Sequence, residues 1–163
     1  MIVQDSLDNK ILLGWREWVS MPELGIPAIK AKVDTGARTS SLHAFQVETF
    51  EECGRRKVRF GIHPLQKRED VTLWCETEVI DHRRVSDSGG HREMRYVIHT
   101  PVRLGSLLWN VEVTLTDRET MQFRMLLGRT AMVGRFTVDP ESSYLMGRKL
   151  RHAYRTGKKR KGA

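Results

Sequence analysis

The residues of this chain whose types and spacing could do chemistry are centred on Asp34, which is followed by Thr35, Gly36 and Ala37. Apolar and polar residues alternate through residues 29–33, and this period of two predicts a β-strand that ends at Asp34. Gly36 can take backbone angles that a side chain forbids, and the Thr35 hydroxyl can stabilise a turn by a local hydrogen bond. The sequence therefore predicts a carboxylate that is held on a tight turn and is open to water, as hydrolysis by an activated water requires.

A second segment, Leu126-Leu127-Gly128, has the composition expected beside such a turn. In aspartic peptidases an apolar-apolar-glycine segment passes next to the catalytic turn, because glycine allows two backbones to approach closely. Each segment also has a simpler interpretation: Asp-Thr-Gly is a common turn composition, and two leucines before a glycine are typical of a buried strand that ends at a turn. The two segments together are more specific than either alone, and they predict an active site with Asp34 as the catalytic residue.

Four segments carry a resemblance to a known family; they are residues 14–19, 29–44, 126–129 and 135–140. They resemble the retropepsin-like family of bacteria and archaea that is labelled as ATP-dependent zinc proteases and is associated with an ATP-grasp glutamate ligase. The resemblance covers residues 11–145. It implies an all-β fold, a retropepsin-like closed acid-protease β-barrel with one short helix, in which Asp34 is the single catalytic aspartate of each chain.

The same resemblance implies a kind of substrate. Members linked to the ligase are implied to remove glutamate residues that the ligase has added to a protein of the small ribosomal subunit. The implied activity of this chain is that of an aspartic-type peptidase that hydrolyses peptide bonds in an acidic or glutamylated protein. The alternative is a non-catalytic barrel that keeps Asp34-Thr35-Gly36 only as a turn and binds a ribosomal or polyanionic partner through its basic tail.

One aspartate per chain cannot hydrolyse a peptide by the aspartic mechanism, because two carboxylates must share a proton and act as base and acid. The triplet Asp87-Ser88-Gly89 does not supply the second carboxylate, since no apolar strand leads into it. A two-fold homodimer would bring Asp34 against its symmetry mate. We therefore expect a homodimer whose monomer is inactive.

Arg38 follows the predicted turn, and the sequence leaves its role open. A guanidinium within about 6 Å of a carboxylate favours the ionised form and would oppose a proton shared by two carboxylates. Arginine also binds carboxylates in a bidentate manner, so Arg38, assisted by Arg129, could recognise acidic side chains of a substrate. The third interpretation is a structural salt bridge from Arg38 to Glu17 or another carboxylate.

Residues 83–99 are expected to form a long hairpin with Ser88, Gly89 and Gly90 at its tip. In a retropepsin-like fold such a hairpin would be the flap that covers substrate. An exposed tip without a function is the equally simple alternative.

Period-two patterns also predict the other strands that must position these residues. His43 lies in the strand that leads away from Asp34, and we expect its side chain at the surface rather than in the wall of the site. A short helix is expected over residues 129–133. The remaining predicted strands comprise residues 11–19, 39–50, 57–62, 71–80, 93–99, 102–105, 107–116, 122–128 and 136–138.

Length and composition predict one soluble globular domain over residues 11–145, between a flexible N-terminus (1–10) and a basic, disordered tail (146–163). No apolar run is long enough to span a membrane and the N-terminus lacks a signal-peptide pattern, so a cytoplasmic protein is expected. Cys53 and Cys75 are too few for a disulfide framework.

The formal net charge of +8 is located mainly in the tail. Residues 147–163 contain eight Lys and Arg and no Asp or Glu, so the rest of the chain is close to neutral. Such a tail is typically solvated and disordered, and the alternative is that it contacts the ribosome, RNA or another polyanion.

No cofactor is expected from the motifs. The six histidines are scattered, and neither a His-Glu-x-x-His nor a Cys-x-x-Cys pattern is present. Only a spatial cluster, such as His82, His91 and His99 across the hairpin, could hold zinc. A phosphate-binding Gly-x-x-x-x-Gly-Lys-Ser/Thr loop is also missing, so we expect any ATP to be used by the ligase.

Overall fold

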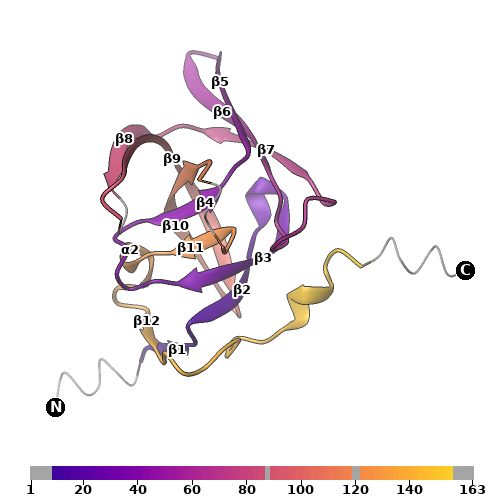
Figure 1. The fold of residues 1–163 in the computed structure, drawn as a ribbon, viewed down its shortest axis with the longest axis vertical. Coiled ribbons are helices and arrows are strands. Elements are labelled where there is room, and N and C mark those ends of the chain that lie inside the picture. The colour runs from indigo at the N-terminus through magenta and orange to yellow at the C-terminus, as the bar shows by residue number, and fades with distance from the viewer. Residues whose placement is uncertain (1–8, 87–88, 119–121, 156–163) are drawn as a thin grey trace, which may run out of the picture.

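The computed structural model of the protein describes residues 9–86, 89–118 and 122–155, and β-strands form most of it (Figure 1). Across these described residues the single α-helix is the short α2 (Arg129–Met132), while η1 (Pro22–Leu24) and η2 (Lys149–His152) are 3-10 helices. None of the described helices is long and apolar enough to cross a membrane. The prediction of a mainly β fold with one short helix is confirmed. The strands are β1 (Ile11–Leu13), β2 (Arg16–Met21), β3 (Ile26–Val33), β4 (Ser40–His43), β5 (Gln46–Glu52), β6 (Arg55–Ile62), β7 (Leu73–Glu78), β8 (Asp81–Ser86), β9 (Arg92–Leu104), β10 (Leu107–Thr116), β11 (Met125–Leu127) and β12 (Phe136–Val138).

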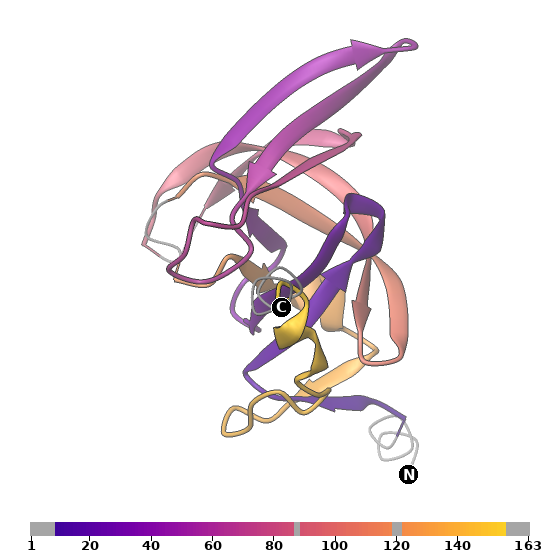
Figure 2. The same cartoon turned by 90° about the vertical axis from the view of Figure 1, so that its right-hand side faces the viewer.

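The largest sheet has seven strands in the order β10-β4-β11-β3-β2-β9-β8. The order returns on itself, because β9 pairs with β10 as well as with β2, and this closure fits the predicted barrel. The pairs β3–β11 and β4–β10 are parallel, so segments distant in the sequence lie side by side. A separate three-stranded sheet contains β5, β6 and β7, and its β5–β6 hairpin projects from the body (Figure 2). The arrangement places β3, which leads into Asp34, between β2 and β11.

Four predicted strands divide or merge in the structure. Residues 11–19 divide into β1 and β2 at Gly14, where a Cβ atom would lie only 2.3 Å from the carbonyl oxygen of Ser142. Residues 39–50 divide near Ala44, because the chain leaves the largest sheet after β4 and enters the three-stranded sheet as β5. The two strands predicted on either side of Thr100 form the single strand β9. These differences depend on contacts between distant segments, which a local period cannot reveal.

Side chains that point inward from the strands build the core. In β3 the side chains of Ala31 and Val33 are buried, whereas Lys32 between them is exposed. Fully burying one large aliphatic side chain stabilises a fold by about 1.5–3 kcal/mol. Because the buried side chains come from strands on both sides of β3, they fix the end of this strand and the residue that follows it. Fully buried examples are Leu13, Ile29, Leu42, Ile98, Met125 and Leu127.

More residues of the C-terminal segment pack against the sheet than the sequence predicts. η2 contacts β2 and β3 (Figure 2), and the Tyr154 hydroxyl donates to the carbonyl oxygen of Ala28 and accepts from its N–H at 3.3 Å. Burial raises the pKa of Tyr154 to about 12, so the hydroxyl stays protonated and remains a donor. The prediction of a disordered tail is therefore wrong for residues 146–155. Residues 156–163, and residues 1–8 of the predicted flexible N-terminus, lie outside the described residues.

A buried carboxylate in β2 also ties this segment to the sheet. Glu17 is fully buried, and its oxygens accept hydrogen bonds from the N–H groups of Gly14 at 2.7 Å, Leu145 at 3.0 Å and Met146 at 3.0 Å. Hydrogen bonds to an ionised acceptor are the stronger kind, and a charge can be buried when such bonds replace its water. Glu17 therefore joins two parts of the chain that the sequence separates widely.

We expect the substitution Glu17→Ala to lower the free energy of unfolding by about 3 kcal/mol or more, because three backbone donors lose their acceptor. Urea denaturation followed by circular dichroism measures this change. The exposed Glu23→Ala is the matched control, and its effect should stay within about 0.5 kcal/mol. Equal effects of the two substitutions would contradict the anchoring role of Glu17.

His43 is buried, with 6% of its surface exposed, so the expectation of a surface position is wrong. All four residues of β4 are buried, because β4 is covered on both faces rather than on one. Burial, followed by the positive charges of Arg124 and His63, lowers the pKa of His43, while Asp117 acts in the opposite direction. The folded protein therefore holds this imidazole in its neutral form more strongly than the unfolded chain does.

This pKa shift predicts a loss of stability in acid. The folded state binds the His43 proton less readily than the unfolded state does. The contribution of neutral His43 to the free energy of unfolding is therefore complete above a pH of about 6.5, the pKa of an unperturbed histidine. It is lost as the pH falls toward the lowered pKa of His43 in the folded protein. We expect the free energy of unfolding of the wild-type protein to fall more steeply below this pH than that of His43→Met. Parallel pH profiles of the two proteins in urea denaturation would refute the prediction.

Candidate active site

The turn after β3 holds the Asp34 carboxylate in place. The Asp34 N–H donates to the carbonyl oxygen of Leu127 at 2.9 Å, and the Gly36 N–H donates to Asp34 Oδ1 at 2.9 Å. The Ala37 N–H closes the turn on the Asp34 carbonyl oxygen at 3.3 Å. The sequence assigned the stabilising hydrogen bond to the Thr35 hydroxyl, but in the structure the Gly36 amide makes it and the Thr35 carbonyl oxygen accepts from Arg129 Nη1 at 2.9 Å. The carboxylate is thus fixed at one oxygen by the backbone of its own turn.

The second motif lies directly beside this turn, as the sequence predicted. β11 runs parallel to β3 with Leu127 opposite Val33, and Gly128 follows. A Cβ atom on Gly128 would lie 2.5 Å from the carbonyl carbon of Thr39, which is closer than real Cβ contacts allow. The buried Gly128 N–H donates to Ser40 Oγ at 2.9 Å. Glycine is therefore required where the two backbones meet.

The start of α2 adds two more backbone hydrogen bonds to the turn. The Arg129 N–H donates to the carbonyl oxygen of Ala37 at 2.7 Å, and the Thr130 N–H donates to that of Arg38 at 3.0 Å. Both motifs are thus held as one rigid unit by main-chain contacts. A residue placed on such a unit keeps its orientation without help from a bound partner.

Asp34 lines a cavity of about 740 Å³. Among the described residues that line it, Asp34 is the one carboxylate, and arginines from several elements surround it. Ser41, Thr116 and Leu126 also contribute to the walls. The arginines are Arg38, Arg83, Arg84, Arg95, Arg118 and Arg129. This excess of positive charge is suited to an acidic ligand.

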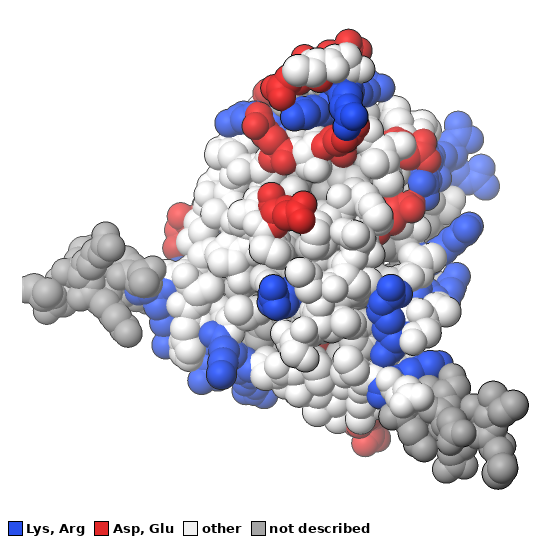
Figure 3. Space-filling view, turned by 180° about the vertical axis from the view of Figure 1, so that it is seen from behind, with Lys and Arg blue, Asp and Glu red and all other residues white. Residues whose placement is uncertain are grey.

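In some other parts of the molecule, charged side chains lie next to side chains of opposite charge. Figure 3 shows acidic side chains next to basic ones on the projecting β5–β6 hairpin. Lys57 pairs there with Glu52 at 2.9 Å, and Arg55 pairs with Glu78 at 3.3 Å. The arginines around Asp34 are balanced only in part, so the cavity differs from the ordinary charged surface of the protein.

Arg83 and Arg95 of the cavity have acidic partners in the part of the chain that the structure describes. Arg83 pairs with Asp81 at 2.8 Å, and the pKa of Asp81 is lowered first by its hydrogen bond from the His82 N–H and then by Arg83. Arg95, which is buried, pairs with Glu93 at 2.7 Å. These pairs hold the two guanidinium groups in the wall. They are therefore fixed before any ligand binds.

Arg38 and Arg84 have no ion pair with a carboxylate within the described part of the chain. Arg38 does not pair with Glu17, whose oxygens are engaged by backbone amides, so that interpretation of Arg38 is wrong. Both guanidinium groups face the cavity that contains Asp34. They remain available to a carboxylate from outside the chain.

The β8–β9 hairpin reaches the same cavity. Val85 and Ser86 at the end of β8 line it, together with the Arg84 side chain. Gly89 and Gly90 of the predicted tip are exposed, and Ser88 lies outside the described residues. The end of β8 thus lines the same cavity as Asp34, and the flap stays a prediction.

Sequence reasoning missed most of the cavity arginines. Arg83 and Arg84 lie in β8, Arg95 lies in β9 and Arg118 follows β10. No short motif contains them, so their only local signal was the pair of adjacent arginines in the hairpin. The fold brings these residues together with Arg38 and Arg129.

The described residues contain no group of three or more His, Cys, Asp or Glu side chains placed to hold a metal ion. His82, one of the histidines considered for such a cluster, instead stacks on Tyr96 with ring centroids 4.3 Å apart. Among the described residues that line the cavity, the charged side chains are those of Asp34 and the arginines.

Comparison with known proteins identifies a family and several relatives of this chain. A family model described as RimB-like, a retropepsin-like aspartic endopeptidase, matches residues 12–149. A protein of Shewanella pealeana named "Probable alpha-L-glutamate ligase" is 48% identical over 142 residues, which are 87% of this chain and 31% of that protein. A protein of the same name from Desulfotalea psychrophila is 45% identical over 157 residues, covering 94% of this chain and 34% of that protein. The chain thus spans about a third of the length of these relatives.

A solved structure shares the fold. The Legionella pneumophila protein Lpg0085, of unknown function, superposes with a TM-score of 0.68 at 25% sequence identity, over 83% of this chain and 97% of that one. The family model covers most of this chain and includes both the Asp34 turn and the Gly128 segment. The chain belongs to the RimB-like family of retropepsin-like aspartic endopeptidases.

Proposed function

We propose that this protein is an aspartic peptidase that hydrolyses peptide bonds in an acidic or glutamylated protein, and that its dyad is formed by Asp34 from the two subunits of a homodimer. One observation carries the proposal: Asp34 is the one carboxylate among the described lining residues of an arginine-rich cavity, and backbone hydrogen bonds hold it in place. A carboxylate kept only to close a turn would need no such cavity.

The reaction needs two Asp34 carboxylates that share one proton. The ionised carboxylate removes a proton from a water molecule while the water oxygen attacks the carbonyl carbon of the scissile bond. The protonated Asp34 of the partner subunit donates its proton to the carbonyl oxygen, which gives a tetrahedral diol. The Asp34 carboxyl group that took the water proton then protonates the amide nitrogen, while the other Asp34 carboxylate removes a proton from a hydroxyl of the diol. The C–N bond breaks, a carboxylic acid and an amine leave, and the pair again shares one proton. In this mechanism the pair of Asp34 carboxyl groups activates the water, and we expect neither zinc nor ATP to take part.

The arginines would select the substrate. Arg38 and Arg84 lack an internal carboxylate partner among the described residues, and each can bind a glutamate side chain in a bidentate manner. Nearby cations favour ionisation of both members of a carboxylate pair, whereas bound acidic side chains would offset that charge. An acidic substrate would therefore bind the cavity and offset part of its positive charge.

The relatives support this substrate class. Proteins named as glutamate ligases contain a region that is similar to almost the whole of this chain. A ligase that adds glutamate and a peptidase that removes it act on the same modified protein. The presence of a region similar to this chain in polypeptides named as glutamate ligases therefore favours a glutamylated substrate.

We expect the purified protein to release glutamate from an oligo-glutamylated peptide. The Asp34→Asn variant should release none, because the asparagine amide cannot replace the carboxylate as base or acid. Mass spectrometry of the products measures both, with and without a metal chelator, which should have no effect. A matched peptide with glutamine in place of glutamate is the control for charge, and its cleavage should be much slower.

Two results would overturn the proposal. Equal glutamate release by Asp34→Asn would remove Asp34 from the mechanism, and release that a chelator abolishes would indicate a metal hydrolase. If the wild-type dimer cleaves no acidic peptide but binds a polyanion as well as Asp34→Asn does, the non-catalytic barrel is the better account.

A further inference from the structure

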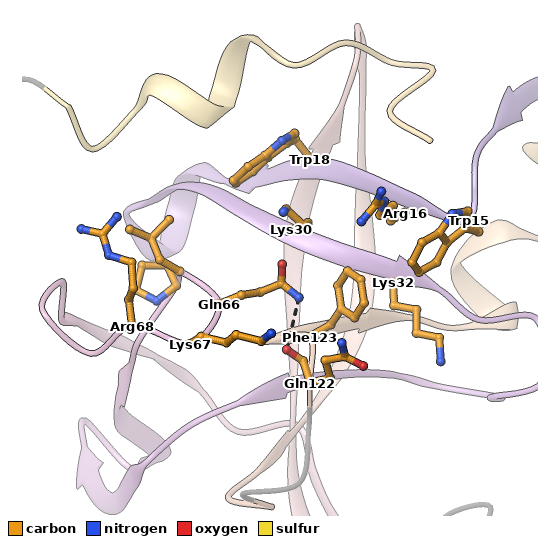
Figure 4. A pocket seen from close by; sticks show the side chains of 12 residues that line it. Trp15, Arg16, Trp18, Lys30, Lys32, Gln66, Lys67, Arg68, Gln122 and Phe123 are labelled. Carbon is orange, nitrogen blue, oxygen red and sulfur yellow. Dashed lines mark hydrogen bonds between the residues drawn. The ribbon is translucent and has the colours of Figure 1, made fainter. Parts of the chain in front are cut away.

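A second cavity, of about 530 Å³, lies over β2 and β3 and is separate from the one that contains Asp34. Figure 4 shows basic and aromatic side chains around it, from these two strands and from the loops at residues 64–68 and 122–123. We call it the β2–β3 basic groove. The side chains used below are Trp15, Arg16, Trp18, Lys30, Lys32 and Lys67.

The groove and the active-site cavity occupy one face of the largest sheet. Ser41 of β4 is opposite Leu126 of β11, Leu126 is opposite Lys32 of β3, and Lys32 is opposite Arg16 of β2. Residues in register on neighbouring strands point to the same side of a sheet. Ser41 and Leu126 line the active-site cavity, whereas Lys32 and Arg16 line the groove. The two sites are therefore adjacent along this face.

The groove carries a strong excess of positive charge. None of the described residues that line it is acidic. Arg68 is neutralised by its ion pair with Asp70, but Arg16, Lys30, Lys32 and Lys67 have no ion pair with a carboxylate of the described chain. The unpaired charges make a polyanion the fitting ligand.

The aromatic rings of the groove bind the cations of this chain. The Arg16 guanidinium lies over the Trp15 ring at 4.6 Å, and Lys30 Nζ lies 5.4 Å from the Trp18 ring centroid. Trp15 also contacts Phe123 edge to face. Rings used in this way orient the cations rather than offer faces on which nucleic-acid bases could stack. An acidic polypeptide, whose carboxylates need only the cations, fits this arrangement better than a single-stranded nucleic acid.

Tyr144 reinforces this arrangement from the C-terminal segment. Its ring lies 5.0 Å from the Arg16 guanidinium, 5.6 Å from Lys30 Nζ and 4.8 Å from the Arg148 guanidinium. Its backbone has a positive φ of 56°, which is uncommon for a residue other than glycine. The Tyr144 N–H donates to the Arg16 carbonyl oxygen at 3.0 Å, which fixes the ring among the three cations. Arg16 and Lys30 of the groove are thus held in position before a ligand arrives.

We propose that the β2–β3 basic groove is a subsite that binds an acidic segment of the substrate polypeptide away from the scissile bond. This inference rests on the proposed peptidase function and deepens it. Leu126 and Arg16 are two strands apart, which is about 10 Å, and an extended peptide crosses that distance in about three residues. A substrate with several consecutive glutamates could therefore occupy both sites, whereas a very short one could occupy only the active-site cavity.

The test is the affinity of a fluorescein-labelled decaglutamate peptide, measured by fluorescence anisotropy on the full chain. The Asp34→Asn background prevents cleavage, and the double substitution Lys30→Gln with Lys32→Gln removes two charges from the groove. We expect about tenfold weaker binding, since each exposed ion pair contributes up to about 1 kcal/mol. Arg103→Gln with Arg135→Gln is the matched control, because both arginines are exposed outside the two cavities and the net charge falls equally. It should change the affinity by less than about twofold.

Lys30→Arg with Lys32→Arg keeps both charges and should retain the wild-type affinity, which separates a charge effect from a folding defect. Equal weakening in the groove and control variants would overturn the proposal. A single-stranded RNA that binds more tightly than decaglutamate and displaces it from the groove would also overturn it and assign the site to nucleic acid.

The groove and the peptidase function can fail separately. If both hold, the Lys30→Gln and Lys32→Gln substitutions in an otherwise wild-type chain raise KM for a long acidic substrate and leave kcat unchanged. If the wild-type protein cleaves no peptide but decaglutamate binding still needs the two lysines, the groove stands as an acidic-peptide site and the peptidase proposal falls. If cleavage depends on Asp34 but the two lysine substitutions do not change KM, the peptidase proposal stands and the groove proposal falls.

Discussion

The contact of Gly128 with the backbone of Thr39 and Ser40 is the constraint on which the rest of the site depends. A Cβ atom at Gly128 would lie 2.5 Å from the Thr39 carbonyl carbon, so only glycine lets β11 pass this close to the chain that follows Asp34. From this contact follow the hydrogen bonds that join the two motifs and the parallel pairing of β11 with β3. The Asp34 carboxylate is therefore already in position once the protein has folded, before a substrate binds.

Electrostatics decides what such a site can use as substrate. Among the described residues, six arginines and one aspartate line the active-site cavity, and the neighbouring groove adds cations without an acidic residue. Internal ion pairs fix Arg83 and Arg95, and aromatic rings orient Arg16 and Lys30. The sheet therefore presents a positive face to a ligand, and the proposed preference for acidic polypeptides rests on this charge.

The sequence predicted the parts of this site that are local. A period of two and an Asp-Thr-Gly turn identified the strand before Asp34, and the short helix after Gly128 was also expected. The arginines of β8 and β9 could not be grouped from sequence, because the closed strand order alone brings them to Asp34. His43 was misplaced for a related reason: alternation suggests one exposed face, whereas β4 is covered on both faces. The C-terminal segment was misjudged because its charge is local, while its anchor, Glu17, is distant and buried.

The central claim is that two Asp34 residues from two subunits make one catalytic centre. Mixing wild-type protein with Asp34→Asn at constant total concentration, after subunit exchange, tests it directly through the rate of glutamate release. If both aspartates are needed, the rate follows the square of the wild-type fraction and falls to about a quarter of the full rate at equal amounts, because only dimers of two wild-type subunits are active. A rate that falls in proportion to the wild-type fraction, to about half at equal amounts, would show that one Asp34 acts alone and would contradict the account.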